Sequence, residues 1–156
     1  MNRHSSRPAF GRMPVGHRGL AIVEFAVTMP LVLLLLAATA DLGRALYQYT
    51  ALNKAVQDGA RYLSEKGFMV ANAVFIDPAD LNRAKNVTVF GTPTGSATAV
   101  LPGFTVDDVT SSVVAGTQFV RVQAAYEFEP LFLAFPFLGS GNVATFTATA
   151  IQKSLR

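Results

Sequence analysis

The sequence predicts an α+β protein in which one long N-terminal helix packs on a small C-terminal antiparallel sheet. Three observations lead to this fold class. Residues 20–40 are almost continuously apolar, residues 42–63 carry apolar side chains at spacings of three and four, and residues 118–129 alternate between two faces. The chain has 156 residues, enough for one modest domain and a membrane anchor.

The first part of the chain, residues 1–19, is predicted to be an unfolded basic leader. It holds four of the thirteen basic residues and none of the ten acidic ones, so nine basic residues face ten acidic ones in the remainder. The net charge of +3 therefore belongs to the leader, and we expect no nucleic-acid-binding surface. Arginines ahead of an apolar run indicate a leader on the cytoplasmic side and a C-terminus outside.

The second part, residues 20–66, is predicted to form one long helix that ends at Gly67. Its first half, residues 20–40, has the length that crosses a hydrocarbon core of roughly 30 Å, and Pro30 inside it is tolerated in membrane helices. Its second half is amphipathic. The predicted apolar face holds Leu42, Leu46, Tyr49, Leu52, Val56, Ala60 and Leu63, and the predicted polar face holds Arg44, Gln48, Asn53, Lys54, Gln57, Asp58 and Arg61.

The third part, residues 67–156, is predicted to hold one short helix and the sheet. Asp77 and Pro78 indicate the start of a helix, which we expect to end near Lys85. Strands are expected at residues 86–90, 97–101, 107–114, 118–129 and 143–152.

The apolar segment at residues 131–138 has two interpretations. It is either a core segment under the sheet or a patch that contacts a partner or a membrane. Tyr62 is expected to pack on the sheet, because it lies too far along the helix for a membrane interface.

The residue types that catalysis and metal binding require are scarce. The chain has no cysteine, and both histidines, His4 and His17, lie in the leader. A chain without the leader therefore lacks the usual zinc ligands and any Ser–His or Cys–His pair. Glu127 and Glu129 fall on one face of a predicted strand, where a solvated face is expected. We expect no enzymatic activity, no metal, no cofactor and no small-molecule substrate.

Glu24 is the one carboxylate within residues 20–40. A deeply placed charge costs on the order of 2.5–3.5 kcal/mol in a membrane helix, so anchoring alone does not explain it. Gly19 can enter a narrow protease subsite, and a cut after it would free the α-amine of Leu20, about one turn from Glu24. Glu24 would then pair with that amine in its own or a neighbouring subunit. The alternative is a first-turn acid favoured by the helix dipole.

The stretch from Arg18 to Tyr62 resembles the TadE-like family of minor pseudopilins, and its beginning resembles the processing site of type IV pilin-like proteins. Family members show an R-G-x-A-x-V-E-F-A-x-x-x-P block, a leucine run, an acidic-x-G-R block and a G-A-R-Y block. The matching residues here are Arg18 and Gly19, Val23 to Ala26, Pro30, Leu33 to Leu36, Asp41 to Arg44, and Asp58 to Tyr62. Residues 126–131 and 148–150 are similar to the family more weakly.

The resemblance implies a minor pseudopilin of the tight-adherence (Flp) pilus system, cut by a prepilin peptidase and needed for pilus assembly. It implies a processing site at Gly19, Leu20, Glu24 and Phe25, and contacts through Glu24, Leu20 and Arg44 with other pilins, pseudopilins and inner-membrane assembly components. It also implies a single-pass inner-membrane protein with a periplasmic C-terminal domain.

Two alternatives remain open. Ala38, Thr39 and Ala40 fit the A-x-A pattern of a secretory cleavage site, and a cut there would release a soluble protein that begins at Asp41. A periplasmic binding protein on an uncut signal anchor is the other alternative, with residues 131–138 as its site.

Overall fold

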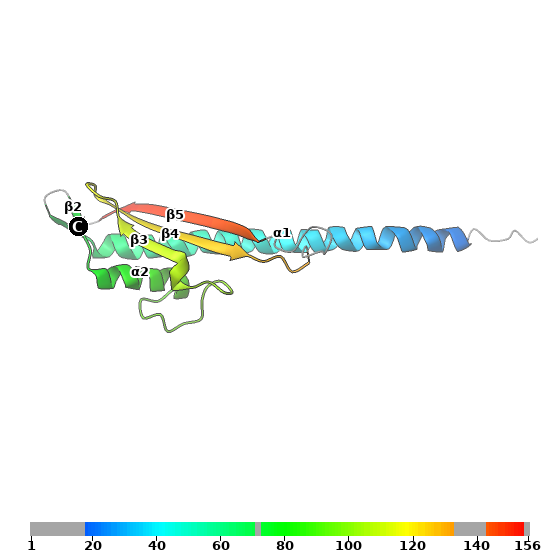
Figure 1. The fold of residues 1–156 in the computed structure, drawn as a ribbon, viewed down its shortest axis with the longest axis horizontal. Coiled ribbons are helices and arrows are strands. Elements are labelled where there is room, and N and C mark those ends of the chain that lie inside the picture. The colour runs from blue at the N-terminus through cyan, green and yellow to red at the C-terminus, as the bar shows by residue number, and fades with distance from the viewer. Residues whose placement is uncertain (1–17, 71–72, 133–142, 155–156) are drawn as a thin grey trace, which may run out of the picture. The chain divides into compact units, whose positions relative to one another are not determined.

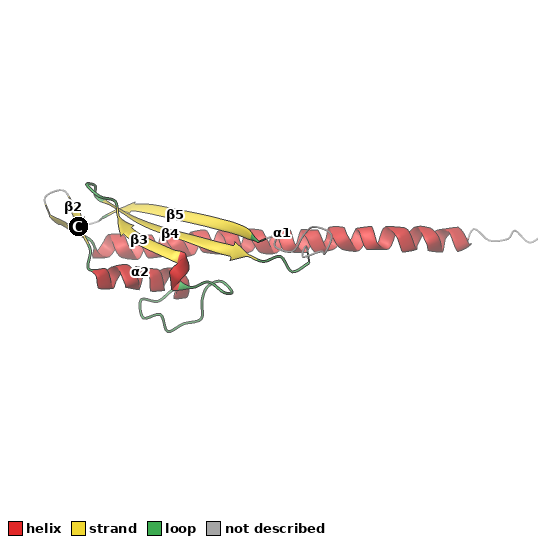
Figure 2. Ribbon diagram, viewed as in Figure 1, coloured by secondary structure: helices red, strands yellow, loops and turns green. Residues whose placement is uncertain are grey.

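The structure, a computed structural model, describes residues 18–70, 73–132 and 143–154. The chain divides into two compact units, Met1–Leu36 and Ala37–Arg156. The described elements are α1 (Arg18–Lys66), β1 (Phe68–Val70), β2 (Ala73–Phe75), α2 (Pro78–Phe90), a 3-10 turn at Val106–Asp108, β3 (Val109–Val113), β4 (Phe119–Phe128) and β5 (Ala144–Lys153) (Figures 1 and 2). A long N-terminal helix followed by a small antiparallel sheet confirms the predicted α+β class.

The described part of the first unit is the N-terminal portion of α1. Every side chain from Ala21 to Leu36 is exposed, although nearly all of them are apolar. Within the described residues α1 is the one helix long and apolar enough to cross a membrane. Pro30 lies inside the helix without ending it, as the sequence predicted.

The second unit is built on a three-stranded antiparallel sheet in the order β3-β4-β5. Ala124 at the centre of β4 pairs with Val109 of β3 and with Ala148 of β5. The side chains of β4 alternate strictly between buried and exposed along the whole strand. The predicted alternation at residues 118–129 is therefore confirmed, and the buried face of β4 is turned toward the helices.

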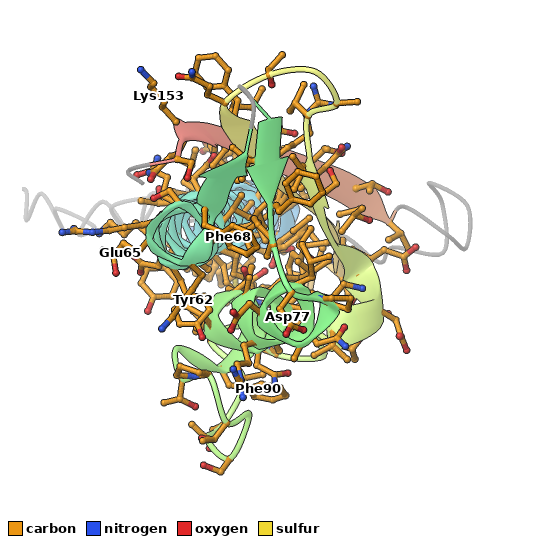
Figure 3. All side chains as sticks on the ribbon, turned by 90° about the vertical axis from the view of Figure 1, so that its left-hand side faces the viewer. Tyr62, Glu65, Phe68, Asp77, Phe90 and Lys153 are labelled. Atoms are coloured by element: carbon orange, nitrogen blue, oxygen red, sulfur yellow. The ribbon has the colours of Figure 1, made fainter. Side chains whose placement is uncertain are left out.

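The helices α1 and α2 lie side by side on that face of the sheet (Figure 3). Together they enclose one hydrophobic core. Its fully buried members include Leu52, Val56, Ala60 and Leu63 of α1, Ala84 and Val89 of α2, and Val120, Val122 and Ala124 of β4. Burial of a leucine or valine side chain typically stabilises a fold by about 1.5–3 kcal/mol, so this cluster holds the second unit together.

The helix α2 starts where the sequence predicted and ends later. The carboxylate of Asp77 accepts a hydrogen bond from the N–H of Ala79 at 2.8 Å, and Pro78 is the first helical residue. The predicted end near Lys85 and the predicted strand at residues 86–90 are both wrong, because the helix continues to Phe90. Gly91 then stops it in the left-handed conformation, with φ at 71°, and donates its N–H to the carbonyl of Val87.

The remaining strand predictions differ in outcome. The strands predicted at residues 107–114, 118–129 and 143–152 are confirmed as β3, β4 and β5 within a few residues. The strand predicted at residues 97–101 is wrong, because this stretch is irregular chain that joins α2 to the 3-10 turn. The hairpin of β1 and β2 was not predicted; it pairs Phe68 with Phe75, whose rings stack 6.2 Å apart.

Candidate assembly and processing site

The predicted processing residues lie at the beginning of α1. The helix starts at Arg18, so Gly19 and Leu20 fall in its first turn. Glu24 lies one turn farther on and is exposed, and Phe25 is 64% exposed. Among the described residues the carboxylate of Glu24 takes part in neither of the two ion pairs, both of which lie in the second unit. Glu24 thus presents an exposed carboxylate on the N-terminal portion of α1.

Asp41 is buried on the second unit's stretch of α1. Only 2% of it is exposed, and its two carboxylate oxygens accept hydrogen bonds from the N–H groups of Leu131 at 3.0 Å and Phe132 at 2.9 Å. Hydrogen bonds to a charged acceptor are about twice as strong as neutral ones. Asp41 thereby fixes the chain at the point where it leaves the end of β4.

Arg44 lies one turn after Asp41 and holds the same end of β4. Its Nη2 donates to the carbonyl of Glu129 at 3.1 Å, and its guanidinium stands 5.3 Å from the ring centroid of Phe128, a cation–π distance. The second guanidinium nitrogen, Nη1, is buried and has no hydrogen-bond partner within the described part of the chain. We call the arrangement of Asp41 and Arg44 on the end of β4 the helix–strand clamp.

The predicted helix faces are wrong around this clamp. Leu42 and Leu46 are 60% and 59% exposed, whereas Asp41 and Gln48, the latter predicted to face outward, are 2% and 3% exposed. For Asp41 the physical reason is the chain after β4, whose backbone N–H groups require polar partners. The burial of Gln48 has no such explanation, because its Oε1 has no hydrogen-bond partner among the described residues.

The clamp borders a cavity of about 370 Å³ in the second unit. The cavity is lined by Arg44, Pro102, Gly103, Asp108, Tyr126, Glu127 and Glu129. Tyr126 donates its hydroxyl proton to the carbonyl of Pro102 at 3.0 Å, and burial raises the pKa of this phenol. Glu127 and Glu129 are exposed, as expected for a solvated strand face.

The G-A-R-Y block marks the contact between α1 and α2. Gly59 is buried against α2, and the neighbouring Ala60 is completely buried in the core. Tyr62 donates a long hydrogen bond of 3.4 Å to Asp80 of α2 and is partly buried against the hydrophobic core. That Tyr62 packs on the sheet stays a prediction. Arg61 is exposed and pairs with Glu65 at 3.6 Å.

The structure brings some predicted site residues together and leaves others apart. Arg44, predicted as an assembly contact, lies in the clamp together with Asp41, which was not predicted as a site residue. Glu24 belongs to the first compact unit. The leader with His4 and His17, and residues 133–138 of the apolar segment, lie outside the described residues; Leu131 and Phe132 at its start are exposed.

The part of the chain that the structure describes contains no group of three or more His, Cys, Asp or Glu side chains that could hold a metal ion. The carboxylate of Asp41 and Nη2 of Arg44 bind backbone groups of the chain that follows β4. The arrangement is thus one that positions a helix against a strand, without a nucleophile paired to a base.

Comparison with protein families gives a match to the family model described as TadE-like protein, over residues 19–61. Comparisons with curated proteins and with solved structures give no match. The matched segment runs from Gly19 through Glu24 and the clamp residues to Arg61, and it includes Gly59 at the helix contact. The resemblance to the TadE-like family, a family associated with the tight-adherence pilus, is therefore confirmed over residues 19–61.

Proposed function

We propose that this protein is a minor pseudopilin of the tight-adherence (Flp) pilus system. A prepilin peptidase cuts it between Gly19 and Leu20, and the processed chain is needed for pilus assembly. The N-terminal portion of α1 anchors it in the inner membrane as a single pass, with the second unit in the periplasm. Other pilins, pseudopilins and inner-membrane assembly components are its partners.

The observation that carries this proposal is the family match, which begins at Gly19 and extends along most of α1. The exposed apolar side chains from Ala21 to Leu36 support an anchor, because lipid or neighbouring helices would cover them. Glu24 supports a role beyond anchoring. A carboxylate among apolar side chains needs a cationic partner, and the new amine of Leu20 is one that cleavage would create.

The test is the N-terminus of the mature protein. Intact mass and N-terminal sequencing of the protein from native membranes should give a chain that begins at Leu20. A chain that begins at Asp41 would identify a secreted protein, and one that begins at Met1 an uncut signal anchor. Either result would overturn the proposal.

Two matched variants make the test sharper. Gly19→Val places a branched side chain where the peptidase requires a small one, so this variant should keep its leader. Ala40→Val blocks the A-x-A pattern instead and should be processed as the parent chain is. The reverse result, with Ala40→Val uncut and Gly19→Val cut, would favour the secretory alternative.

A further inference from the structure

We propose that Leu131 and Phe132 form a second membrane contact, in which their side chains enter the lipid bilayer beside the end of the apolar span, residues 20–40. The ligand is the boundary between phospholipid headgroups and acyl chains. This inference deepens the proposed function and rests on it for one step, the insertion of the apolar span in a membrane. The evidence is the exposure of the two side chains, their attachment to Asp41, and the place of Asp41 in the chain.

Leu131 and Phe132 follow the end of β4 and are exposed. Their side chains are 66% and 52% exposed, so neither belongs to the hydrophobic core. Leu42, the helical residue next to Asp41, is also 60% exposed. Adjacent residues of a helix lie about 100° apart around its axis, so apolar surface is exposed on more than one side of α1 here. Exposed apolar side chains that gather at one place are typical of a contact surface.

Asp41 fixes the position of this segment along α1. It directly follows the apolar span and is the first charged residue after Glu24. The last residues of the span, 37–40, belong to the second unit, as Asp41 and the segment do. The carboxylate of Asp41 lies within 3.0 Å of the backbone nitrogens of Leu131 and Phe132. Because helical side chains tilt toward the helix N-terminus, this carboxylate points back toward the span. Leu131 and Phe132 therefore lie beside its last turn.

This position matches the headgroup boundary of a bilayer. The hydrocarbon core is about 30 Å thick, which residues 20–40 cross, and the headgroup layer on each side is roughly 5–8 Å thick. Asp41 lies only about 1.5 Å farther along the helix axis than Ala40. A tilt of about 20°, the average for membrane helices, shifts a group roughly 8 Å from the helix axis by only about 3 Å. Groups in contact with Asp41 therefore stay at this boundary whatever the tilt within that range.

The backbone of the segment is prepared for an apolar environment. Pro130 has no N–H, and the N–H groups of Leu131 and Phe132 both donate to Asp41. The carbonyl of Glu129, just before them, accepts from Arg44. A backbone donor without a partner is costly in lipid, whereas water would satisfy it at no such cost. A segment whose donors from Pro130 to Phe132 are absent or bound is therefore suited to lipid.

The test uses tryptophan fluorescence, because the chain has no tryptophan of its own. The full-length Phe132→Trp variant is reconstituted in vesicles of phosphatidylethanolamine and phosphatidylglycerol, with and without lipids brominated near the headgroup end of the acyl chains. Its emission should be blue-shifted and should lose most of its intensity to the brominated lipid. Blue-shifted emission without this quenching would mean that protein covers the site, and emission typical of water would mean that nothing does. Either result would overturn the proposal.

Phe119→Trp is the matched control. Phe119 is also an exposed aromatic residue, at 43%, and it lies at the other end of β4. Nine residue steps separate it from Phe128, or roughly 30 Å at 3.3 Å per residue. Its emission should therefore be insensitive to the brominated lipid. Equal quenching of the two variants would show that the bilayer does not select Phe132.

A smaller probe at the neighbouring position repeats the test, in case tryptophan disturbs the segment. The chain has no cysteine, so Leu131→Cys and Phe119→Cys each accept a single nitroxide spin label. Oxygen concentrates in lipid and a charged or chelated nickel relaxant stays in water. The label at position 131 should respond more to oxygen, and the label at position 119 more to nickel. A stronger response to nickel at position 131 would refute the membrane contact.

Alkaline carbonate extraction of the same vesicles separates this inference from the proposed function. Protein that stays in the vesicles while the Phe132→Trp variant is not quenched would refute the second contact and leave the anchor intact. Protein that carbonate removes would refute the anchor, and the second contact with it.

Discussion

Gly59 of α1 lies directly against the hydroxyl of Thr88 in α2, with no room for a side chain between them. A Cβ added to Gly59 would overlap Thr88 Oγ1 and stand 3.2 Å from the carbonyl oxygen of Ala84. The Thr88 hydroxyl is itself bound to that carbonyl at 2.9 Å, so it cannot turn away without losing its bond. The glycine of the G-A-R-Y block is therefore what allows α2 to pack closely on α1.

Gly59→Ala should destabilise the second unit by about 1–3 kcal/mol, the usual cost of overpacking, despite the higher helix propensity of alanine. Thr88→Ala removes the overlapping atom, so the double variant should recover part of the loss. The measurement is a double-mutant cycle on chemical unfolding of the detergent-solubilised protein. Strict additivity of the two changes would contradict the proposed contact.

Gly43→Ala is the matched control for this prediction. Gly43 lies in the same helix, and no atom stands within 4 Å of a Cβ added there. Its replacement should therefore stabilise the helix by about 0.5–1 kcal/mol through backbone entropy alone. A loss at Gly43 as large as that at Gly59 would show that packing on Thr88 is not the cause.

Thr88 also shows where prediction from the sequence failed. Val87, Thr88 and Val89 form a β-branched run, which favours a strand by propensity. All three are buried against the core as part of α2, and tertiary packing overrides a propensity difference of a few tenths of a kcal/mol per residue. Gly91 carried the useful signal, because a glycine after an amphipathic stretch indicates a helix end.

The clamp could be predicted only in part. The spacing of Asp41 and Arg44 was visible, and so was the similarity of residues 126–131 to the family. Asp41 binds the backbone N–H groups of Leu131 and Phe132, about 90 residues away. A contact with backbone groups does not depend on the side chains at those positions, so the sequence of residues 131 and 132 does not indicate it. Leu52, Val56 and Ala60 were correctly predicted as buried, because there the helix meets apolar side chains of the sheet.

Asp41→Ala should destabilise the second unit by about 1.5–3 kcal/mol, because the N–H groups of Leu131 and Phe132 lose a charged acceptor. Asp41→Asn keeps one acceptor oxygen and should cost less. The measurement is again chemical unfolding, with hydrogen exchange of the two amides as a local readout.

Asp58→Ala is the control for the loss of a carboxylate from α1. Asp58 is exposed, so its removal should change the stability by no more than about 0.5 kcal/mol. Equal losses at Asp41 and Asp58 would mean that the hydrogen bonds to Leu131 and Phe132 contribute nothing measurable.

Tyr126 should make stability fall at alkaline pH. Burial raises the pKa of its phenol in the folded state; Arg44 opposes this and Glu129 adds to it. The unfolded chain therefore ionises first, near pH 10, and stability is lost as the pH rises from there through the folded-state pKa. Tyr126→Phe should lose about 1 kcal/mol at pH 7, with the bond to Pro102, and show a shallower alkaline loss. Unfolding midpoints at pH 7 and in a series above pH 9 check this. Identical alkaline slopes for the parent and the variant would contradict it.

Glu24→Ala should spare membrane insertion and impair pilus assembly. Removing the carboxylate lowers the cost of insertion, so the variant should reach the membrane as well as the parent chain does. If Glu24 pairs with the amine of Leu20 in the assembled bundle, its loss leaves that amine buried without a partner, and piliation should fall at least tenfold. The measurements are membrane fractionation, N-terminal sequencing and pilus counts by electron microscopy on one sample.

Thr28→Ala is the control, because the Thr28 hydroxyl donates to the backbone carbonyl of Glu24 and its removal leaves the carboxylate in place. Loss of pili with insertion and processing intact would locate the defect in assembly, whereas normal piliation in Glu24→Ala would remove the proposed role of Glu24.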